Sequence, residues 1–499
     1  MSEAKAPRYG LLGLMVLLLV GALLATVRFS TPPEAGDEQP VESSQPANKG
    51  LGSLAELDGK PPAHRSLDIQ SWQTEQGARV LFVAAPQLPM FDLRLTFAAG
   101  SSQDGDLPGL ALLTNAMLNE GVPGKDVTAI AEGFEDLGAQ FGNGAYRDMA
   151  VLSLRSLSAA EQREPALALF KQVIGQPSFP QDSLERIRNQ LLASLEQQKR
   201  NPGKLGSNAL FQRLYGSHPY ASPSDGTADS LRQIDVAALR AFHQRAYAAG
   251  NLVIALVGDL SREQAEALAA EVSAALPAGP ALAKIGAPEQ PKPGPSHIEF
   301  PSNQTHLLLA QLGVERRNPD YPALYLGNQI LGGGGFGSRL MEEVREKRGL
   351  SYGVYSGFSP MQARGPFMIS LQTRADQSQA TLELGRSVLS GFLADGPTQA
   401  ELDNAKRELS GSFPLSTASN ADIVGQLGAI GFYDLPLNWL EDFVAQVQAL
   451  DAKQVREAMQ RHLDAEQLVV VTVGPTVEQK PLPEPGSQPA PPVDSGPRH

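Results

Sequence analysis

The residues of this sequence best suited to chemistry on a peptide are an arginine and a tyrosine, Arg345 and Tyr352. Residues 338–345 have helical spacing, residues 346–349 end that helix at a glycine, and a strand is expected from Leu350. A cation in the last helical turn and a phenol just beyond it could face one cleft, where they suit peptide carbonyls and a developing oxyanion. The alternative is structural: an arginine favoured by the helix dipole beside a packed tyrosine.

Metal-ligand patterns are absent from the sequence. No two histidines are close enough to share a helical face, and neither His-x-x-Glu-His nor His-Glu-x-x-His occurs. The loop residue His218 is expected to be a structural hydrogen-bonding residue. We therefore expect no metal and no cofactor in this chain. The histidines are His64, His218, His243, His297, His306, His462 and His499.

A run of four glycines, Gly332, Gly333, Gly334 and Gly335, precedes the Arg345 helix. It follows a helix rather than a strand, and no Gly-Lys-Ser/Thr completes a phosphate loop. Its plain interpretation is a helix end that runs into a turn. A functional interpretation stays open, because backbone without side chains can approach a bound peptide closely.

Two periods alternate along the chain around these residues. Alternation of apolar and polar residues predicts strands at 79–84, 93–98, 149–154, 306–312 and 367–373. Helical spacing predicts helices at 160–174, 183–199, 321–331, 377–394 and 399–413. Strands interrupted by long helices imply an α+β fold, with helices packed on a mostly antiparallel sheet.

The body of the chain contains two copies of one domain. Residues 235–258 resemble residues 451–474 at one offset, so that Arg240 matches Arg456, and an upstream match joins 180–191 to 397–409. The Pro-rich stretch 287–295 lies between the copies. A repeat of this length indicates a duplicated domain rather than a solenoid.

Composition excludes several functions. The chain has 499 residues, a formal net charge of −13 and no cysteine. The absence of cysteine excludes disulfides, thiolate metal sites, a cysteine nucleophile and a lipoprotein anchor. The acidic balance and the lack of a Lys/Arg cluster argue against nucleic acid as a partner.

The N-terminus predicts an exported, membrane-anchored protein. Lys5 and Arg8 precede the apolar run 10–27, which as a helix would be about 27 Å long. Acidic residues follow it, so the N-terminus is expected in the cytoplasm and the bulk of the chain in the periplasm, with the helix in the inner membrane. The alternative is a cleaved signal peptide, which also implies export.

These observations predict six segments. They are a cytoplasmic tip with a transmembrane anchor (1–29), a flexible tether (30–66), a first domain (67–286), a linker (287–296), a second domain (297–475) and a disordered Pro-rich tail (476–499).

The segment from Ile330 to Tyr352, with its glycine run, Arg and Tyr, resembles the second-domain signature of pitrilysin/insulinase-type peptidases, which include the mitochondrial processing peptidase and its bacterial heterodimeric relatives. The resemblance spans roughly residues 67–475 and includes His218-Pro-Tyr and residues 256–259. It implies two homologous α+β domains, which agrees with the duplication.

The family's zinc helix reads approximately Gly-Leu-Ala-His-x-x-Glu-His-Met, and residues 109–117 resemble its flanks only. Leu112 and Ala116 stand where the resemblance places the two histidine ligands, and Asn115 stands at the general base. Ser194 falls at the third ligand, with Glu196 two positions away. Leu and Ala carry no lone pair and an amide is no base at neutral pH, so the metal chemistry is lost.

In heterodimeric relatives one subunit carries the zinc helix and the other supplies the Arg and Tyr. The resemblance therefore implies a non-catalytic subunit, in which Arg345 holds the substrate backbone and Tyr352 supports the carbonyl oxygen for a zinc-bearing partner. Phe141, Gly142 and Asn143, in the stretch 138–146, resemble the edge strand on which the family docks extended peptides.

Two alternatives remain open from the sequence. One is a peptide-binding or structural pseudo-enzyme with no proteolytic role. The other is a self-sufficient peptidase with an unconventional metal site. The sequence does not name the substrate, the partner or the stoichiometry.

Overall fold

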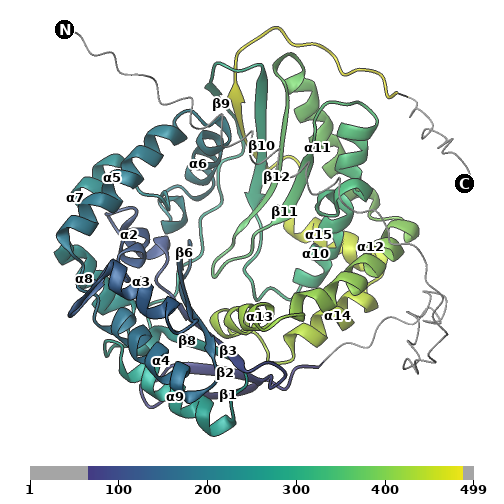
Figure 1. The fold of residues 1–499 in the computed structure, drawn as a ribbon. Helices are drawn as coiled ribbons and strands as arrows, with labels where there is room; N and C mark the ends of the chain where they lie inside the picture. The colour runs from purple at the N-terminus through teal and green to yellow at the C-terminus, as the bar shows by residue number, and fades with distance from the viewer. Residues whose placement is uncertain (1–65, 487–499) are drawn as a thin grey trace, which may run out of the picture. The chain divides into compact units, whose positions relative to one another are not determined.

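Two mixed sheets, each covered by helices, make up the part of the chain that the computed structural model describes, residues 66–486 (Figure 1). The predicted anchor and nearly all of the predicted tether lie outside these residues. Within the described range, no helix has the length and apolar character needed to cross a membrane.

The first copy contains a six-stranded sheet of order β1-β2-β8-β3-β7-β6, in which only the β2–β8 pair is parallel. Its strands are β1 Gln70–Gln73, β2 Arg79–Ala84, β3 Met90–Phe97, β6 Gln140–Ala145, β7 Ala150–Leu157 and β8 Leu252–Gly258, with a small hairpin of β4 Gly121–Val122 and β5 Lys125–Asp126. Its helices are α2 Leu110–Ala116, α3 Val127–Glu135, α4 Ala160–Gly175, α5 Gln181–Gln198, α6 Pro202–Tyr215, α7 Ala228–Gln233, α8 Val236–Ala246 and α9 Arg262–Ala274.

The second copy contains a five-stranded sheet of order β11-β12-β10-β13-β9, in which only the β13–β9 pair is parallel. Its strands are β9 Gly294–Glu299, β10 Gln304–Leu312, β11 Val354–Phe358, β12 Pro366–Arg374 and β13 Val469–Gly474. Its helices are α10 Tyr321–Asn328, α11 Ser378–Asp395, α12 Gln399–Ser412, α13 Asn420–Phe432, α14 Trp439–Ala449 and α15 Ala452–His462, with π-helical turns at Gln329–Gly333 and Met341–Glu346. The α+β fold predicted from the alternating periods is confirmed.

The duplication is visible element by element. Helices α8 and α15 each begin after an aspartate, Asp235 and Asp451, whose side chain accepts a hydrogen bond from the backbone N–H three residues on. This N-cap satisfies one of the free donors of the first turn. Each helix then leads into β8 or β13, a member of the one parallel strand pair of its sheet. The repeated sequence therefore encodes a repeated helix–strand unit.

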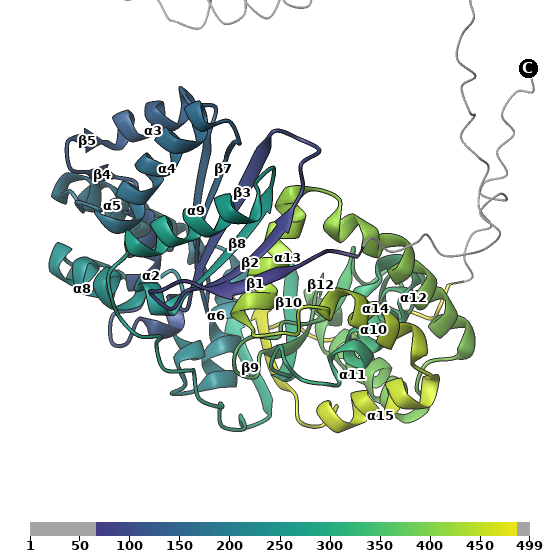
Figure 2. The same ribbon diagram turned by 90° about the horizontal axis from the view of Figure 1, so that it is seen from below.

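Each copy lends one helix to the sheet of the other. Helix α13, from the second copy, packs on β2, β3 and β8, while α6, from the first copy, packs on β10 and β13 (Figures 1 and 2). Leu427 of α13 and Leu210 of α6 are both fully buried in these contacts. Helices α13 and α6 thus cover the second face of the sheet on which each packs, and the other helices of each copy pack on the first face.

A buried polar group also joins the two copies. The hydroxyl of Tyr220 donates to the carboxylate of Asp148 and accepts from the backbone N–H of Ala363 at 3.1 Å. The same carboxylate accepts from the N–H of Gln362 at 2.7 Å. Burial raises the pKa of the Asp148 carboxyl, although these hydrogen bonds oppose the shift. The His218-Pro-Tyr motif thus places a tyrosine that holds the β11–β12 connection of the second copy.

The C-terminal segment follows an ordered path beyond β13. Gln479 donates to the carbonyl of Ala375 at 2.9 Å, Lys480 pairs with Asp376 at 2.8 Å, and the N–H of Gly486 donates to the carbonyl of Lys347 at 2.8 Å. Residues 476–486, the first part of the predicted tail, are thus held mainly by hydrogen bonds to the surface of the second copy, and residues 487–499 lie outside the described residues.

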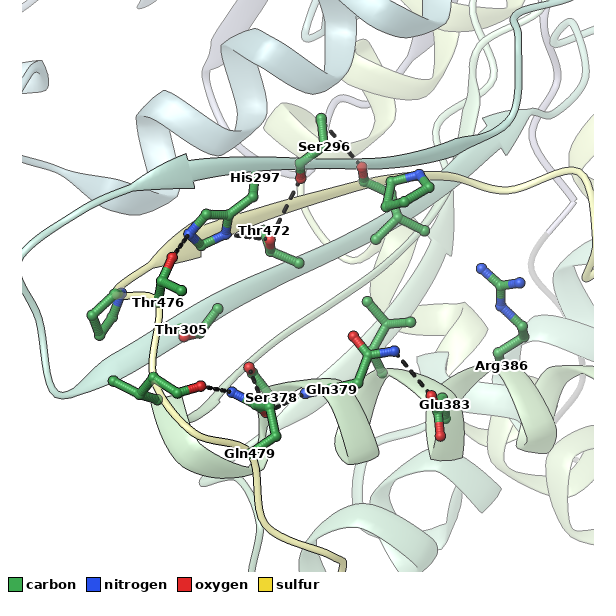
Figure 3. Close-up of a pocket in the computed structure, with 15 residues that line it drawn as sticks. Ser296, His297, Thr305, Ser378, Gln379, Glu383, Arg386, Thr472, Thr476 and Gln479 are labelled. Carbon is green, nitrogen blue, oxygen red and sulfur yellow. Dashed lines mark hydrogen bonds between the residues drawn. The ribbon is translucent and has the colours of Figure 1, made fainter.

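This path leaves a hollow where the first copy has a helix. After β8 the chain returns as α9 over β2 and β8, whereas after β13 it stays extended, and a pocket of about 780 Å³ lies between the sheet and α11 (Figure 3). The sheet side of this pocket carries His297, Thr305 and Thr472. The register aligns His297 and Thr472 with Phe82 and Leu256, which are buried in the first copy.

The Pro-rich connection contributes a strand. Residues 294–299 form β9, so the last three residues of the predicted linker, 294–296, lie in the sheet. Pro295 is tolerated there because β9 is an edge strand and a missing N–H costs no ladder hydrogen bond on the outer side. The domain boundaries themselves stay a prediction.

Candidate functional site

Arg345 lies on the π-helical turn Met341–Glu346. Met341 and Val344 face the core of the second copy and are fully buried, so Arg345 points away from it. The turn ends where Gly349 adopts φ +60° and its N–H donates to the carbonyl of Arg345 at 2.8 Å. The predicted helix is therefore present, but its last part is wound as π-helix, and the following strand begins at 354 rather than 350.

The guanidinium of Arg345 lies close to two exposed aromatic rings. Its Cζ is 4.4 Å from the ring centroid of Phe336 and 5.1 Å from that of Tyr352. Tyr352 is 91% exposed and Phe336 is 65% exposed, so neither ring is packed in the core. The structure thus brings the predicted pair together. Phe336 was missed in the sequence, although its place directly after the glycine run was a usable signal.

The charge of Arg345 is not neutralised within the described part of the chain. No ion pair or side-chain hydrogen bond joins it to a carboxylate there, and two of the nearby acids, Glu342 and Glu343, have other partners. Glu343 pairs with Lys347 and Arg348, each at 2.6 Å, and Glu342 pairs with Lys347 at 2.9 Å. A half-buried guanidinium that contacts two exposed rings and has no carboxylate partner can donate to the oxygen atoms of a ligand.

Helix α2 carries the residues aligned with the zinc motif. Its first turn is capped by Asp104, whose carboxylate accepts from the N–H groups of Gly109 at 2.8 Å and Ala111 at 2.7 Å. Burial raises the pKa of this carboxyl to about 7, and the two backbone hydrogen bonds oppose the shift. The scaffold of the helix is therefore intact at its N-terminal end.

The side chains at the former ligand positions do not fit a zinc ion. Leu112 and Ala116 are half-buried hydrocarbons, and the Asn115 amide donates to the hydroxyl of Tyr247 at 3.1 Å in the core. Ser194 is exposed, and Glu196 is exposed and paired with Lys199 at 2.7 Å. In residues 66–486 no group of three or more His, Asp or Glu side chains is placed to hold a metal. The side chains present at this helix are therefore unsuited to binding a zinc ion.

The edge strand β6 lies beside α2. The amide of Asn143 donates to the backbone carbonyl of Asn115 at 2.8 Å, a contact between two predicted sites that the sequence did not suggest. Phe141 points to the helices instead, with its ring stacked 5.6 Å from that of Phe134. Gly142 is required by packing, because a Cβ there would lie 2.7 Å from the hydroxyl of Ser153. What β6 offers a peptide is its backbone edge, which pairs with no strand of the described chain.

The glycine run serves packing first. Gly332 is buried, and a Cβ there would lie 2.5 Å from Oγ of Ser356 and 2.7 Å from Leu340. Gly333 and Gly334 close against Asn328 and Gln329, and Gly335 has φ +68°. This differs from the expected peptide contact at Gly332, because the π-helical turn presses the backbone against β11. Gly333 to Gly335 remain open to a ligand.

The histidines of the described range occupy separate structural positions. His218 accepts from the N–H of Tyr220 at 3.2 Å, which agrees with the predicted loop role. His243 is buried with its ring nitrogen 2.8 Å from the carbonyl of Ile174, and burial lowers its pKa. His297 contacts Thr472, and His462 contacts Asp320, both at 2.8 Å. His306 lies on the open face of β10, while His64 and His499 lie outside the described residues.

Comparisons with known proteins agree with this geometry. The family model described as "Insulinase (Peptidase family M16)" matches residues 79–228, and that described as "Peptidase M16 inactive domain" matches residues 233–409. A crystal structure of a peptidase M16 inactive domain from Pseudomonas fluorescens is 68% identical and covers 84% of this chain and 100% of that chain, with a TM-score of 0.82.

Two relatives extend the comparison. The "non-peptidase homolog YmxG" of Helicobacter pylori is 28% identical over 392 residues, which are 77% of this chain and 89% of that protein. An "uncharacterized zinc protease YmxG" of Bacillus subtilis is 24% identical over 414 residues, 82% of this chain and 98% of that protein. The chain therefore belongs to the M16 (insulinase) peptidase family, of which it is an inactive member.

Proposed function

We propose that this chain is the non-catalytic subunit of a periplasmic zinc metallopeptidase and supplies Arg345 and Tyr352 to a partner that carries His-x-x-Glu-His. The observation that carries the proposal is the contrast between two sites. The Arg345 guanidinium is half-buried, has no carboxylate partner in the described chain and contacts two exposed rings, whereas the former zinc helix has no metal donor. A complete substrate-binding pair without hydrolytic chemistry suits a subunit that assists another.

The chemistry of the pair is that of hydrogen-bond donation. The planar guanidinium of Arg345 can donate two hydrogen bonds to a backbone carbonyl or carboxylate of an extended peptide. The hydroxyl of Tyr352, exposed and without a partner in the described chain, can donate to the carbonyl oxygen that gains negative charge during attack. The nucleophile and the Lewis acid are assigned to the partner, and extended peptides are the expected substrates.

Strand β6 supports the same proposal. Its outer backbone edge is unpaired in the described chain, so an extended peptide can add to the sheet as a further strand. Asn143 ties this edge to α2, which corresponds in position to the helix that bears zinc in active relatives. Backbone pairing is tolerant of side-chain identity, and it would hold peptides of varied sequence.

The proposed location rests on the N-terminal charge pattern. Lys5 and Arg8 precede the apolar run 10–27, and acidic residues follow it. We propose a single-pass inner-membrane anchor with the two domains in the periplasm. Protease accessibility in spheroplasts, with and without permeabilisation, tests this orientation.

Reconstitution tests the main proposal. The chain is purified with the His-x-x-Glu-His homologue from the same cells, and turnover of a fluorogenic peptide library is measured. Arg345→Ala and Tyr352→Phe are each expected to lower kcat/KM by about 100-fold, the usual effect of removing one oxyanion donor. Arg407→Ala and Tyr325→Phe, which lie outside the site, are the matched controls. Unchanged turnover in both site variants would refute the proposal.

A second candidate function is peptide binding without cleavage. It is favoured by the unpaired edge of β6, which needs no metal to hold a peptide. Measurements with and without the zinc-bearing homologue distinguish the two functions. Peptide affinity that the homologue does not change, with no turnover in the mixture, would support binding alone.

A further inference from the structure

A cavity of about 420 Å³ lies beside Tyr352, on the face of the second sheet on which α6 packs. Its walls come from both copies, since the first turn of α6 borders it at Gly203 and strands β10, β11 and β12 form its floor. The cavity is therefore continuous with the Arg345–Tyr352 pair.

The strand register explains why polar side chains gather there. His306 pairs with Gln372, and Ser370 pairs with Leu308 on one side and with Tyr355 on the other. Alternate residues of a strand share a face, so these side chains point to the cavity while Leu307 and Leu309 enter the core. The alternation of polar and apolar residues is visible in the sequence, but by itself it predicts only an exposed face of each strand. Which side chains meet in a cavity depends on how the strands pair.

Six hydrogen-bonding side chains of the lining have no partner in the described protein. They are Gln304, His306, Tyr352, Tyr355, Ser370 and Gln372. By contrast, the hydroxyl of Ser351 is used internally and donates to the carbonyl of Gly353 at 2.7 Å. Covering these groups with a purely apolar ligand would cost their hydration without compensation. The occupant must offer both donors and acceptors.

The lining carries no formal charge. None of its residues is Asp, Glu, Lys or Arg, and burial lowers the pKa of the His306 imidazole, so this side chain is neutral at pH 7. A charged side chain would lose water there and find no counter-ion among the lining residues. A carboxamide, with one acceptor oxygen and two N–H donors, matches the set of amides, hydroxyls and imidazole.

We propose that this cavity receives an uncharged carboxamide side chain, Gln or Asn, of the peptide held by Arg345 and Tyr352. The proposal rests on the proposed function, which it deepens by naming a residue preference. Tyr352 belongs to both features, since its ring contacts Arg345 and the residue also lines the cavity. The preference is set by this chain rather than by the partner.

Equilibrium binding to the full-length chain tests the preference. The probes are fluorescein-labelled alanine hexapeptides in which each position in turn carries Gln, Asn, Glu, Lys or Leu, and Kd is measured by anisotropy. At one position the Gln or Asn peptide is expected to bind five- to tenfold more tightly than the alanine host, roughly the worth of one or two hydrogen bonds. Glu, Lys and Leu at that position are expected to give no gain.

A charge change in the cavity sharpens the test. Gln372 is exposed, so Gln372→Glu is expected to fold normally, to lose the Gln preference and to bind the Lys peptide most tightly. Gln446→Glu makes the same change on exposed α14, outside the cavity, and is expected to keep the wild-type order. Equal Kd values for all peptides in the wild type, or the same order in Gln372→Glu, would overturn the preference.

The proposed function is judged separately in the same assay. Arg345→Ala is expected to weaken every peptide, including the alanine host, whatever residue occupies the cavity. If the preference is absent but Arg345→Ala still weakens all peptides, only the cavity proposal fails. If Arg345→Ala binds all peptides as the wild type does, the proposed role of the pair fails.

Discussion

The amide of Asn115 donates a hydrogen bond to the hydroxyl of Tyr247 at 3.1 Å, at the position where the M16 resemblance places a general base. Asn115 is 2% exposed and Tyr247 is fully buried, and burial raises the pKa of the tyrosine above its ordinary range. A residue that would activate water in an active relative thus satisfies a core hydroxyl here. The replacement converts a catalytic position into a structural one.

Removing this amide is expected to destabilise the first copy. Asn115→Ala leaves the Tyr247 hydroxyl buried without a partner, which costs about 1–3 kcal/mol in the free energy of unfolding. Urea denaturation measures it. Tyr247→Phe in the Asn115→Ala background removes the orphaned hydroxyl, so the double variant should lose less than the sum of the two single variants; simple additivity would show that the hydrogen bond contributes nothing.

The exchanged helix α13 supplies a matched pair of glycines. A Cβ at Gly431 would lie 2.3 Å from Val253 and 2.8 Å from Leu81, whereas a Cβ at Gly425 meets nothing within 4 Å. Gly431→Ala is expected to cost about 1–3 kcal/mol through overpacking, and Gly425→Ala to be neutral or to stabilise by up to about 1 kcal/mol through helix propensity. Equal effects of the two substitutions on the unfolding free energy would contradict the close packing of α13 on the first sheet.

The Tyr220 hydroxyl is expected to hold the two copies together. Tyr220→Phe leaves the Asp148 carboxylate and the N–H of Ala363 short of a partner in a buried site, at a cost of about 2–3 kcal/mol. Hydrogen exchange should accelerate first at residues 359–365. Tyr325→Phe, whose hydroxyl has no hydrogen bond in the described chain, is the control, and an equally small effect for both variants would count against the contact.

Stability is expected to depend on pH through Asp104. Burial raises its pKa from the ordinary value to about 7 in the folded protein, despite the nearby Arg147 and Arg245. Because the pKa of this carboxyl is higher in the folded than in the unfolded protein, its contribution to the free energy of unfolding is complete below the unfolded pKa, near 4. That contribution is lost as the pH rises through 7. The loss is on the order of a few kcal/mol.

A substitution at the exposed neighbour Asp106 distinguishes the effect of the Asp104 carboxyl from that of other groups. Asp104→Asn should flatten the decline in unfolding free energy between pH 4 and pH 8, measured by urea titration, while Asp106→Asn should leave it unchanged. A decline of the same size in all three proteins would mean that Asp104 is not its source.

Much of the fold follows from local patterns. The strand at 79–84 has the bounds predicted for it, although its residues 80–83 are all buried because helices cover both faces of the sheet. Helix 160–175 extends one residue beyond its predicted end. The path of α6 and α13 onto the opposite sheets could not be predicted, since each is an amphipathic helix whose sequence does not say which sheet it covers. The π-helical winding at 341–346 was equally hidden, because it depends on tertiary contacts around Gly332.

The residues of the candidate site could be predicted from the sequence better than the contacts between them. Arg345 and Tyr352 were identified from their types and spacing, and the structure places them together. The contact of Phe336 with the guanidinium and the link from Asn143 to Asn115 required the three-dimensional arrangement. The cavity beside Tyr352 depends on pairing between strands far apart in sequence, which no single segment reveals.

Zinc content tests the central claim most directly. The full-length chain is purified, dialysed against excess zinc and then against metal-free buffer, and its metal is measured by mass spectrometry beside the His-x-x-Glu-His homologue. The account predicts well below one zinc per chain, no proteolysis by the chain alone, and stoichiometric zinc in the homologue. One tightly held zinc per chain, with peptide cleavage that a chelator abolishes, would contradict it.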